Sequence, residues 1–333
     1  MRYVVFGTCP YPVLQVLPKL SVGCDRGALY LRGEAGVLEQ AQEWGLVELA
    51  QAGGVARPTA RLGLVDPGAS RNIADRVQSV LTGYLEVLGE AAADLETGYR
   101  RTPACTEQGW AWDRVQHLVV GGWLMDLGFA RAAAAASHPR AGAEWRVVGY
   151  AGLPLPATQC GVRLRWGTAA VLGEFWAEDR LRVPGLPLNL EPHELDVLAA
   201  VARAGEAPAG EIPPGVAGKL RYLGLLRAPG ARRLKPALPV FDPPECESLE
   251  ARVLGWAQAL YRACRDALPP DPGAEGEVLR LAFFRGLLTA AYAAAQGVGI
   301  LPIGRGGVPK GWGLWLWLEP SPQQLLGHAG EAV

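Results

Sequence analysis

The sequence lacks an excess of charge and is poor in histidine. Its 32 lysines and arginines balance 33 acidic residues, which gives a formal net charge of −1, and there are 4 histidines. A protein that binds nucleic acid over its whole surface has a clear basic excess. Any such function of this chain therefore depends on a local patch.

Cysteine is present, but not in a metal-binding pattern. None of the six cysteines forms a CxxC pair or lies at zinc-ligand spacing from a histidine: Cys9, Cys24, Cys105, Cys160, Cys246 and Cys264. Isolated cysteines of this kind are typical of reduced, buried thiols in a cytosolic protein. We expect no metal and no cofactor.

Motifs for catalysis are also missing. The sequence contains no GxSxG, HExxH, P-loop or dinucleotide-binding fingerprint. The glycine-rich stretch from Gly304 to Gly313 follows a predicted helix and precedes a predicted strand, which is the reverse of a phosphate loop. We predict no catalytic residue. An enzyme whose site lies between two repeated units stays open as an alternative.

A membrane span is not expected. The N-terminal "MRYVVFGTCPYP" is broken by proline too early for a signal peptide. The stretch from Gly286 to Gly304 carries no charge, but it contains Gln296 and is interrupted by glycines and Pro302. It predicts a packed core helix followed by a loop. We therefore expect a cytoplasmic protein that does not enter a membrane.

What the sequence does contain is an internal similarity. "EWGLVEL" around Gly45 resembles "RYLGLLRA" around Gly224, and Asp66-Pro67 matches Asp242-Pro243 further along. Residues 112–136 then resemble residues 276–296, and a tryptophan-led strand pattern follows each of them. This shared order indicates a duplication. The predicted units are residues 1–160 and 161–333.

The second unit has the clearer order of elements. A helical pattern covers 191–204, prolines leave a turn or very short helix, and a further helix runs from Pro214 until Gly224 ends it. A basic hairpin follows, and two longer helices begin after Asp242-Pro243.

These residues resemble the bacterial winged helix–turn–helix regulators of the MarR, ArsR and PadR type. Leu223-Gly224-Leu225-Leu226, the Pro229-Gly230 turn and Arg232-Arg233 carry the resemblance. It implies a mainly α fold with small β hairpins (α+β), built from tandem winged-helix units that are each followed by a helical layer and a strand. The expected ranges are a degenerate winged helix at about 10–66, helices at 70–136, a strand at 145–150, a winged helix at about 189–242, helices at 245–296 and a strand at 312–318.

The resemblance places a DNA-binding surface on the second winged helix. The candidate residues are Lys219, Arg221, Tyr222, Arg227, Arg232, Arg233 and Lys235. In such a fold the third helix enters the major groove and the wing reaches the backbone. The corresponding helix of the first unit instead carries carboxylates, which would repel phosphates: Glu34, Glu39, Glu43 and Glu48.

Tryptophan is abundant, with 11 in the chain. Trp112, Trp123 and Trp256 on the predicted helical layer are candidates for binding a small aromatic or apolar effector. Core packing is the alternative that we favour, because tryptophan buries a large area. In "WGLWLWL" (312–318) the apolar residues fall on both faces of a strand, which predicts burial on both sides.

Three hypotheses follow for the function. The first is a winged-helix regulator that binds double-stranded DNA, with an effector pocket in the helical layer and pairing into a homodimer. The second is a winged-helix scaffold for protein–protein contacts that does not bind DNA. The third is the enzyme described above.

Overall fold

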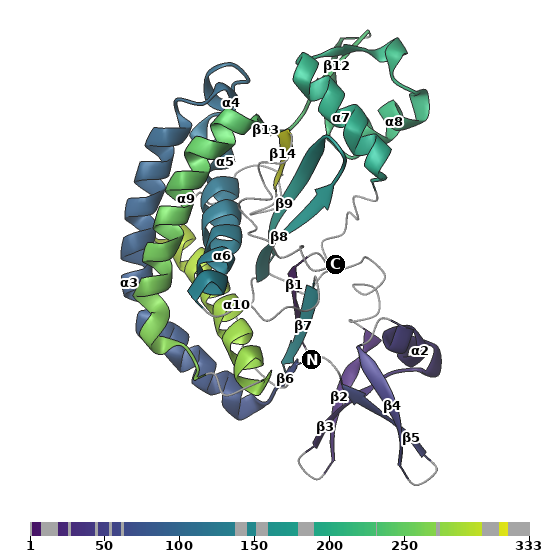
Figure 1. The fold of residues 1–333 in the computed structure, drawn as a ribbon, viewed down its shortest axis with the longest axis vertical. Helices are drawn as coiled ribbons and strands as arrows, with labels where there is room; N and C mark the ends of the chain where they lie inside the picture. Colours follow the sequence, from purple (N-terminus) through teal and green to yellow (C-terminus); the bar gives the residue numbers. More distant parts are fainter. Residues whose placement is uncertain are drawn as a thin grey trace.

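The structure, a computed structural model, describes residues 2–7, 19–25, 28–43, 46–52, 55–60, 63–136, 145–150, 159–178, 190–230, 232–270, 274–301 and 313–318. The molecule is elongated, with a layer of long helices along it, two small sheets beside that layer and a small lobe at each end (Figure 1). The first lobe comprises the described residues between 19 and 60, and the second lobe those between 190 and 236. The prediction of a mainly α protein with small sheets is confirmed.

The helices and strands have the following bounds. The helices are α2 (Ala35–Glu43), α3 (Pro67–Tyr99), α4 (Pro103–Thr106), α5 (Trp112–Gln116), the π-helix η2 (His117–Gly128), α6 (Phe129–Ala136), α7 (Pro192–Ala204), the 3₁₀ turn η3 (Ala209–Glu211), α8 (Pro214–Tyr222), α9 (Pro243–Cys264), the 3₁₀ turn η4 (Arg265–Ala267) and α10 (Ala274–Gly297). The strands are β1 (Arg2–Gly7), β2 (Ser21–Asp25), β3 (Ala28–Arg32), β4 (Val47–Ala52), β5 (Val55–Ala60), β6 (Gly63–Val65), β7 (Trp145–Tyr150), β8 (Gln159–Trp166), β9 (Ala170–Glu178), β10 (Ala207–Pro208), β11 (Leu226–Gly230), β12 (Arg233–Pro236), β13 (Val240–Phe241) and β14 (Gly313–Leu318).

The long helices α3 and α9 begin in the same way. Each follows a short strand, and each has an aspartate cap followed by a proline. Asp66 Oδ1 accepts hydrogen bonds from the amides of Gly68 (2.6 Å) and Ala69 (2.9 Å). Asp242 and Glu245 cap each other's backbone amides. Such caps satisfy amides that have no partner inside the helix, which stabilises each helix by about 1 kcal/mol.

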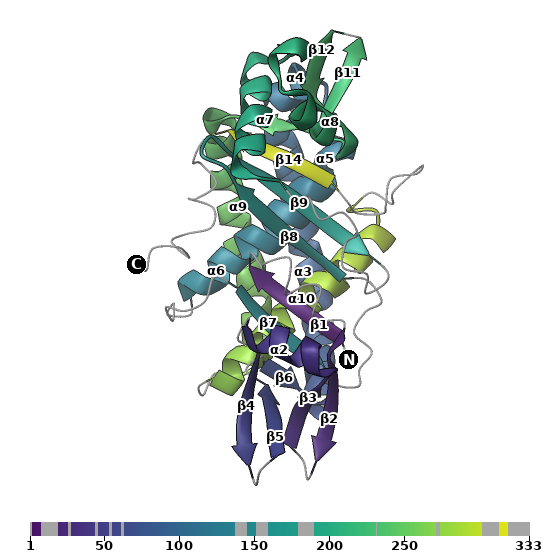
Figure 2. The ribbon, with the colours of Figure 1, turned by 90° about the vertical axis from the view of Figure 1, so that its right-hand side faces the viewer.

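The two sheets that lie against the helices share a strand order. In the first sheet β6 runs parallel to β7, and β7 runs antiparallel to β1. In the second sheet β13 runs parallel to β14, β14 runs antiparallel to β9, and β8 extends the sheet beyond β9. Figure 2 shows both sheets in front of the long helices, with a lobe at either end. In each sheet one strand follows the helices in the chain: β7 follows α3 to α6, and β14 follows α9 and α10.

The helices cross between the two halves of the chain. α10 packs on α3 and also contacts β6 and β7 of the first sheet. Conversely, η2 and α6 contact α9, and η2 also contacts β8, β9 and β14 of the second sheet. The two halves are therefore interlocked, and neither buries its apolar helix faces alone.

A buried ion pair joins the crossing helices to the second sheet. The guanidinium of Arg285 on α10 donates to the carbonyl of Cys160 on β8 (2.6 Å) and lies 3.4 Å from Asp126 Oδ2 on η2. Asp126 also accepts the amide hydrogen of Val162 at 2.6 Å. A buried charge is tolerated when it is paired and hydrogen-bonded in this way.

Strand β14 separates two hydrophobic cores. Trp315 and Trp317 face the main core beneath the long helices, whereas Leu314, Leu316 and Leu318 belong to the core of the second lobe. The prediction that both faces of this strand are buried is confirmed. The ring of Trp315 lies against Gly173 on β9, where a Cβ would come within 2.0 Å of it, so only glycine fits that position.

α10 is the described helix that is long and apolar enough to cross a membrane, over Gly276–Gly297. More than half of that window is buried inside the protein, and Phe283 and Tyr292 are part of the main core. The helix ends at Gly297, and Gly299 adopts a positive φ of 82° in the turn that follows. This agrees with the expected core helix, whereas the expected loop at 302–312 lies outside the described residues.

The first lobe differs from the order expected of a winged helix. The expected helix near residues 10–18 lies outside the described residues, and the hairpin β2–β3 occupies the next segment. α2 then leads into a second hairpin, β4–β5. The sequence pattern extends one helix as far as Glu48, but the structure places Glu48 on β4, paired with Thr59. The prediction that Glu48 lies on the helix was wrong, because strand pairing overrides its local helical preference.

Candidate nucleic-acid interface

The second lobe is a small domain of three helical segments and a three-stranded sheet. Along the chain it contains α7, β10, η3, α8 and the hairpin β11–β12, and its strands lie in the order β10-β12-β11. α7 begins with a capping box between Glu191 and Glu194 and a proline in the first turn. Its core consists mainly of leucines, namely Leu195, Leu198, Leu220, Leu223, Leu225, Leu226 and Leu234.

α8 has one buried and one exposed face. Leu220 is fully buried, and the residues that face solvent are Pro214, Gly215, Gly218, Arg221 and Tyr222. Gly224 ends the helix with φ at +70°, a left-handed conformation that favours glycine. As the sequence predicts, α8 runs directly into the hairpin.

The hairpin is anchored in the core by one residue of each strand, and the rest of β11 is exposed. Leu226 and Leu234 point into the lobe, while Arg227 and Arg232 are exposed. β11 pairs with β12 through Leu226 opposite Pro236 and Arg227 opposite Lys235. The carbonyl of Arg232 accepts the amide hydrogen of Ala209, which ties the turn to η3.

Three of the seven candidate residues for DNA contact are held by carboxylates of the same lobe. Lys219 Nζ lies 2.5 Å from Glu194 Oε2 on α7, so it is drawn against the lobe and not fully toward solvent as expected. Glu206 pairs with both Arg233 and Lys235, the latter at 3.1 Å. These cations are partly neutralised before any partner arrives.

The Glu194 carboxyl reflects this pairing. Its burial alone would raise its pKa, but the hydrogen bonds from Lys219 and from the Glu191 amide outweigh that effect and bring the pKa below its ordinary value. The carboxylate is thus ionised at neutral pH and holds Lys219 in place.

The other four candidates are free of ion pairs within the described part of the chain. Arg221, Arg227 and Arg232 are exposed, and Tyr222 retains 84% of its accessible surface. All four belong to α8 and the adjoining hairpin, and we call them the unpaired set. Three guanidinium groups without internal partners can bind phosphate oxygens with little competition.

The corresponding helix of the first lobe has the opposite charge. Glu39 and Glu43 on α2 and Glu34 just before it are exposed. In the segment that follows this helix, Arg57 lies on β5, and Arg61 lies outside the described residues. The two lobes therefore present opposite charges on the helix that precedes a hairpin.

The three tryptophans that are candidates for binding an effector lie in two places. Trp123 is fully buried, with its ring centroid 4.8 Å from that of Phe241 and 4.9 Å from that of Trp317. Trp112 packs on Tyr99 in the same core. Trp256 lies between α9 and α3, where its indole donates to Asp94 at 2.9 Å. Each of the three rings is occupied by packing or hydrogen bonding within the chain.

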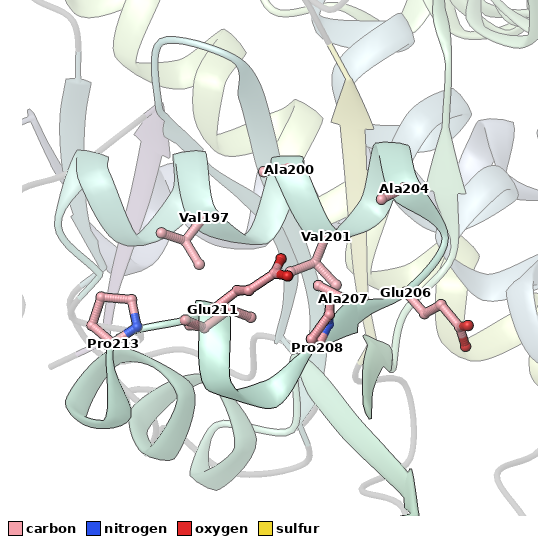
Figure 3. Close-up of a pocket in the computed structure, with 10 residues that line it drawn as sticks. Val197, Ala200, Val201, Ala204, Glu206, Ala207, Pro208, Glu211 and Pro213 are labelled. Atoms are coloured by element: carbon pink, nitrogen blue, oxygen red, sulfur yellow. The ribbon is translucent and has the colours of Figure 1, made fainter. Parts of the chain in front are cut away.

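A shallow groove of about 390 Å³ crosses the second lobe between α7 and the segment that follows it (Figure 3). Its walls are largely apolar and contain two carboxylates: Val197, Ala200, Val201, Ala204, Glu206, Ala207, Pro208, Glu211, Ile212 and Pro213. In Figure 3 the Glu211 side chain extends toward α7, while Glu206 lies at the end of the groove nearest Ala204. Within the described residues, no group of three or more His, Cys, Asp or Glu side chains is placed to hold a metal.

Two functional features escape sequence reasoning. The first is the division of the cations by Glu194 and Glu206, because Glu194 pairs with Lys219 and Glu206 pairs with Arg233 and Lys235, all of them well beyond α7 in the sequence. The second is the bare surface of α8 at Gly215 and Gly218, which becomes visible only once the buried face is known. Comparison of the chain with protein-family models, with curated proteins and with solved structures gave no match.

Proposed function

We propose that this protein binds DNA through its second lobe, which we assign to the winged-helix type. The assignment is supported by the order helix, strand, short helix, helix and hairpin, and by the strand order β10-β12-β11. In that arrangement α8 takes the place of the helix that lies against the major groove, and the hairpin takes that of the wing. The role that the resemblance implies is transcriptional regulation.

The observation that carries the proposal is the unpaired set. Arg221, Arg227 and Arg232 have no ion pair in the described part of the chain, although carboxylates neutralise their neighbours Arg233 and Lys235. When such cations contact phosphates they release counterions from the DNA, and this release supplies most of the non-specific affinity of a protein for DNA. The near-neutral net charge is compatible with this, because the three arginines of the unpaired set all belong to α8 and the adjoining hairpin.

We also propose that the chain arose by duplication and that only the second unit contacts DNA. The shared strand orders of the two sheets, the two aspartate-capped helices and the helix–hairpin in each lobe support the duplication. The exposed carboxylates of α2 would repel a phosphate backbone. One chain then offers one DNA-contacting lobe, and a homodimer would offer two.

The proposal does not include an effector site at the tryptophans. Trp123 and Trp112 are packed among other aromatic rings, and the Trp256 indole is bound to Asp94. A ligand at any of the three would have to displace these contacts.

DNA binding is tested with the full chain and a fluorescein-labelled 20-base-pair duplex of mixed sequence, by fluorescence anisotropy at 50 mM salt. The variant Arg221→Ala/Arg227→Ala/Arg232→Ala removes the arginines of the unpaired set and leaves every ion pair of the described residues in place. We expect it to lose affinity by at least about tenfold, because each charged hydrogen bond contributes roughly 1 kcal/mol or more.

Arg71→Ala is the matched control, because Arg71 is an exposed arginine in the first turns of α3, outside the lobe. It should bind like the wild type. Equal affinities for the wild type and the triple variant would refute the proposed function, and so would absence of wild-type binding at 50 mM salt both to this duplex and to a 20-nucleotide single strand.

A second candidate function is the docking of a partner protein in the groove on α7. The groove favours it because Ala200, Ala204 and Pro208 are exposed, and Glu211 provides a carboxylate among them. The occupant of matching chemistry is a peptide segment with an apolar side chain next to a lysine or arginine. Peptides of that pattern can be selected from a display library with the wild-type protein. They should not bind the Glu211→Lys protein, and replacing the cation of the peptide with glutamate should restore binding to that variant.

A further inference from the structure

The exposed face of α8 carries few side chains that can read a base pair. Pro214, Gly215 and Gly218 occupy its first two turns, and Lys219 is held by Glu194. Sequence is read in a duplex by side chains that donate to or accept from base edges in the major groove. On this helix such groups are confined to Arg221 and Tyr222 in the last turn, which is little for a sequence-specific duplex reader.

The two glycines are not required by packing within the chain. A Cβ at Gly215 or at Gly218 would meet nothing within 4 Å. Apart from proline, glycine is the least favourable residue inside a helix, so neither packing nor helix stability explains it here. What the glycines do is leave the helix surface open beside Tyr222.

Tyr222 is placed so that its ring is accessible. It follows Gly218 by four residues, and helical side chains lean toward the N-terminus over the residue four positions earlier. Because that position has no side chain, the ring is uncovered, in agreement with its 84% exposure. Arg221 adjoins it in the sequence, and Arg227 and Arg232 lie on the hairpin that follows.

We propose that the second lobe binds single-stranded DNA in preference to duplex, with Tyr222 stacked on an unpaired base and the three arginines on the adjacent phosphates. An accessible aromatic ring among cations is the combination by which proteins bind single strands with little dependence on sequence. This inference rests on the proposed function, since it needs the arginines of the unpaired set to contact DNA.

The test compares a labelled 20-nucleotide oligo-dT with the labelled 20-base-pair duplex, by fluorescence anisotropy of the full chain at 50 mM salt. The wild type should bind the single strand more tightly than the duplex. Tyr222→Ala should weaken single-strand binding by about 5- to 150-fold, the range measured for the loss of one base stack, and should weaken duplex binding by a clearly smaller factor. Tyr222→Phe should keep the preference, and Tyr222→Leu, which has bulk but no ring, should lose it.

Gly218→Leu is a second and independent variant. Its side chain would stand one turn before Tyr222 on the same side of the helix and would reduce access to the ring, while leucine is a better helix former than glycine. We expect weaker single-strand binding together with an unchanged or higher melting temperature. Gly255→Leu is the matched control, because Gly255 is an exposed helical glycine on α9 whose Cβ also meets nothing.

The outcomes separate the two proposals. No binding of either DNA overturns both this inference and the proposed function. Duplex binding that equals or exceeds single-strand binding overturns this inference alone, and so does an equal loss for both forms in Tyr222→Ala. Single-strand binding that survives in Gly218→Leu also contradicts it.

Discussion

Replacing Arg285 with methionine tests how the two halves of the molecule are held together. The side chains of Arg285 and Asp126 retain only 10% and 15% of their accessible surface, so removal of the arginine leaves a largely buried carboxylate. Loss of one partner of a buried ion pair costs about 3–5 kcal/mol. Because Asp126 keeps the hydrogen bond from the Val162 amide, we expect the lower end, about 3 kcal/mol.

The assay is equilibrium urea unfolding at pH 7, followed by tryptophan fluorescence. A loss of about 3 kcal/mol is a large share of the roughly 5–15 kcal/mol by which a domain is stable. The double variant Asp126→Asn/Arg285→Met removes the stranded charge, so it should be more stable than Arg285→Met alone. Arg71→Met, on the exposed face of α3, should change the unfolding free energy by less than about 0.5 kcal/mol.

A cost below about 1 kcal/mol for Arg285→Met would refute this reasoning. Strictly additive single and double variants would refute it as well, because residues in one ion pair are expected to couple by roughly 0.5–3 kcal/mol. In either case the pair would not be what ties α10 and η2 to β8.

Three further predictions concern other parts of the molecule. Gly173→Ala should cost about 3 kcal/mol or prevent folding, because its Cβ would lie 2.0 Å from the Trp315 ring; urea unfolding checks this. Burial raises the pKa of Glu245, although the hydrogen bonds that its carboxylate accepts act in the opposite direction. The wild type should therefore gain stability relative to Glu245→Gln as the pH is lowered from 7 toward 4.5, which urea unfolding at several pH values checks. Arg232→Ala should weaken DNA binding more than Arg233→Ala, because Glu206 already neutralises Arg233; anisotropy measurements compare the two.

Each of these has a result that contradicts it. A Gly173→Ala protein as stable as the wild type would contradict the first prediction, because it would mean that the Trp315 ring has room to move. A raised pKa of Glu245 means that the ionised form is disfavoured in the folded state. The prediction is therefore contradicted if the stability of the wild type, relative to that of Glu245→Gln, increases as the pH rises. Equal losses in Arg232→Ala and Arg233→Ala would show that internal pairing does not divide the cations.

The local parts of the fold could be predicted from the sequence. Asp66 and Asp242, each followed by a proline, mark the starts of α3 and α9, and Gly224 marks the end of α8. These signals depend on a few neighbouring residues, whose backbone preferences and capping hydrogen bonds are fixed locally. The alternation in β14 likewise predicts its two buried faces.

The parts that depend on distant residues could not be predicted. The sequence pattern did not predict the hairpin β8–β9, whose place in the sheet depends on pairing with β14 far along the chain. The π-helix η2 replaces the expected α-helix where Gly121 and Gly122 lie against Phe175 and Trp315. Tertiary packing overrides local propensity at both places.

For the candidate site, the sequence predicts the cations but not their availability. Glu194 and Glu206 decide which of them are neutralised, and both precede α8 in the chain. The exposure of Tyr222 likewise depends on which face of α8 is buried. A charge pattern in the sequence thus gives the candidates, and the fold selects among them.

The salt dependence of DNA affinity tests the central claim most directly. The measurement is the slope of log K against log salt between 50 and 200 mM, for the wild type and for Arg221→Ala/Arg227→Ala/Arg232→Ala. Because each phosphate contact contributes a slope of about 0.7 on a single strand and 0.9 on a duplex, the loss of three contacts should make the slope shallower by about 2–3. Identical slopes for the two proteins would contradict the account, since they would mean that these arginines do not contact phosphate.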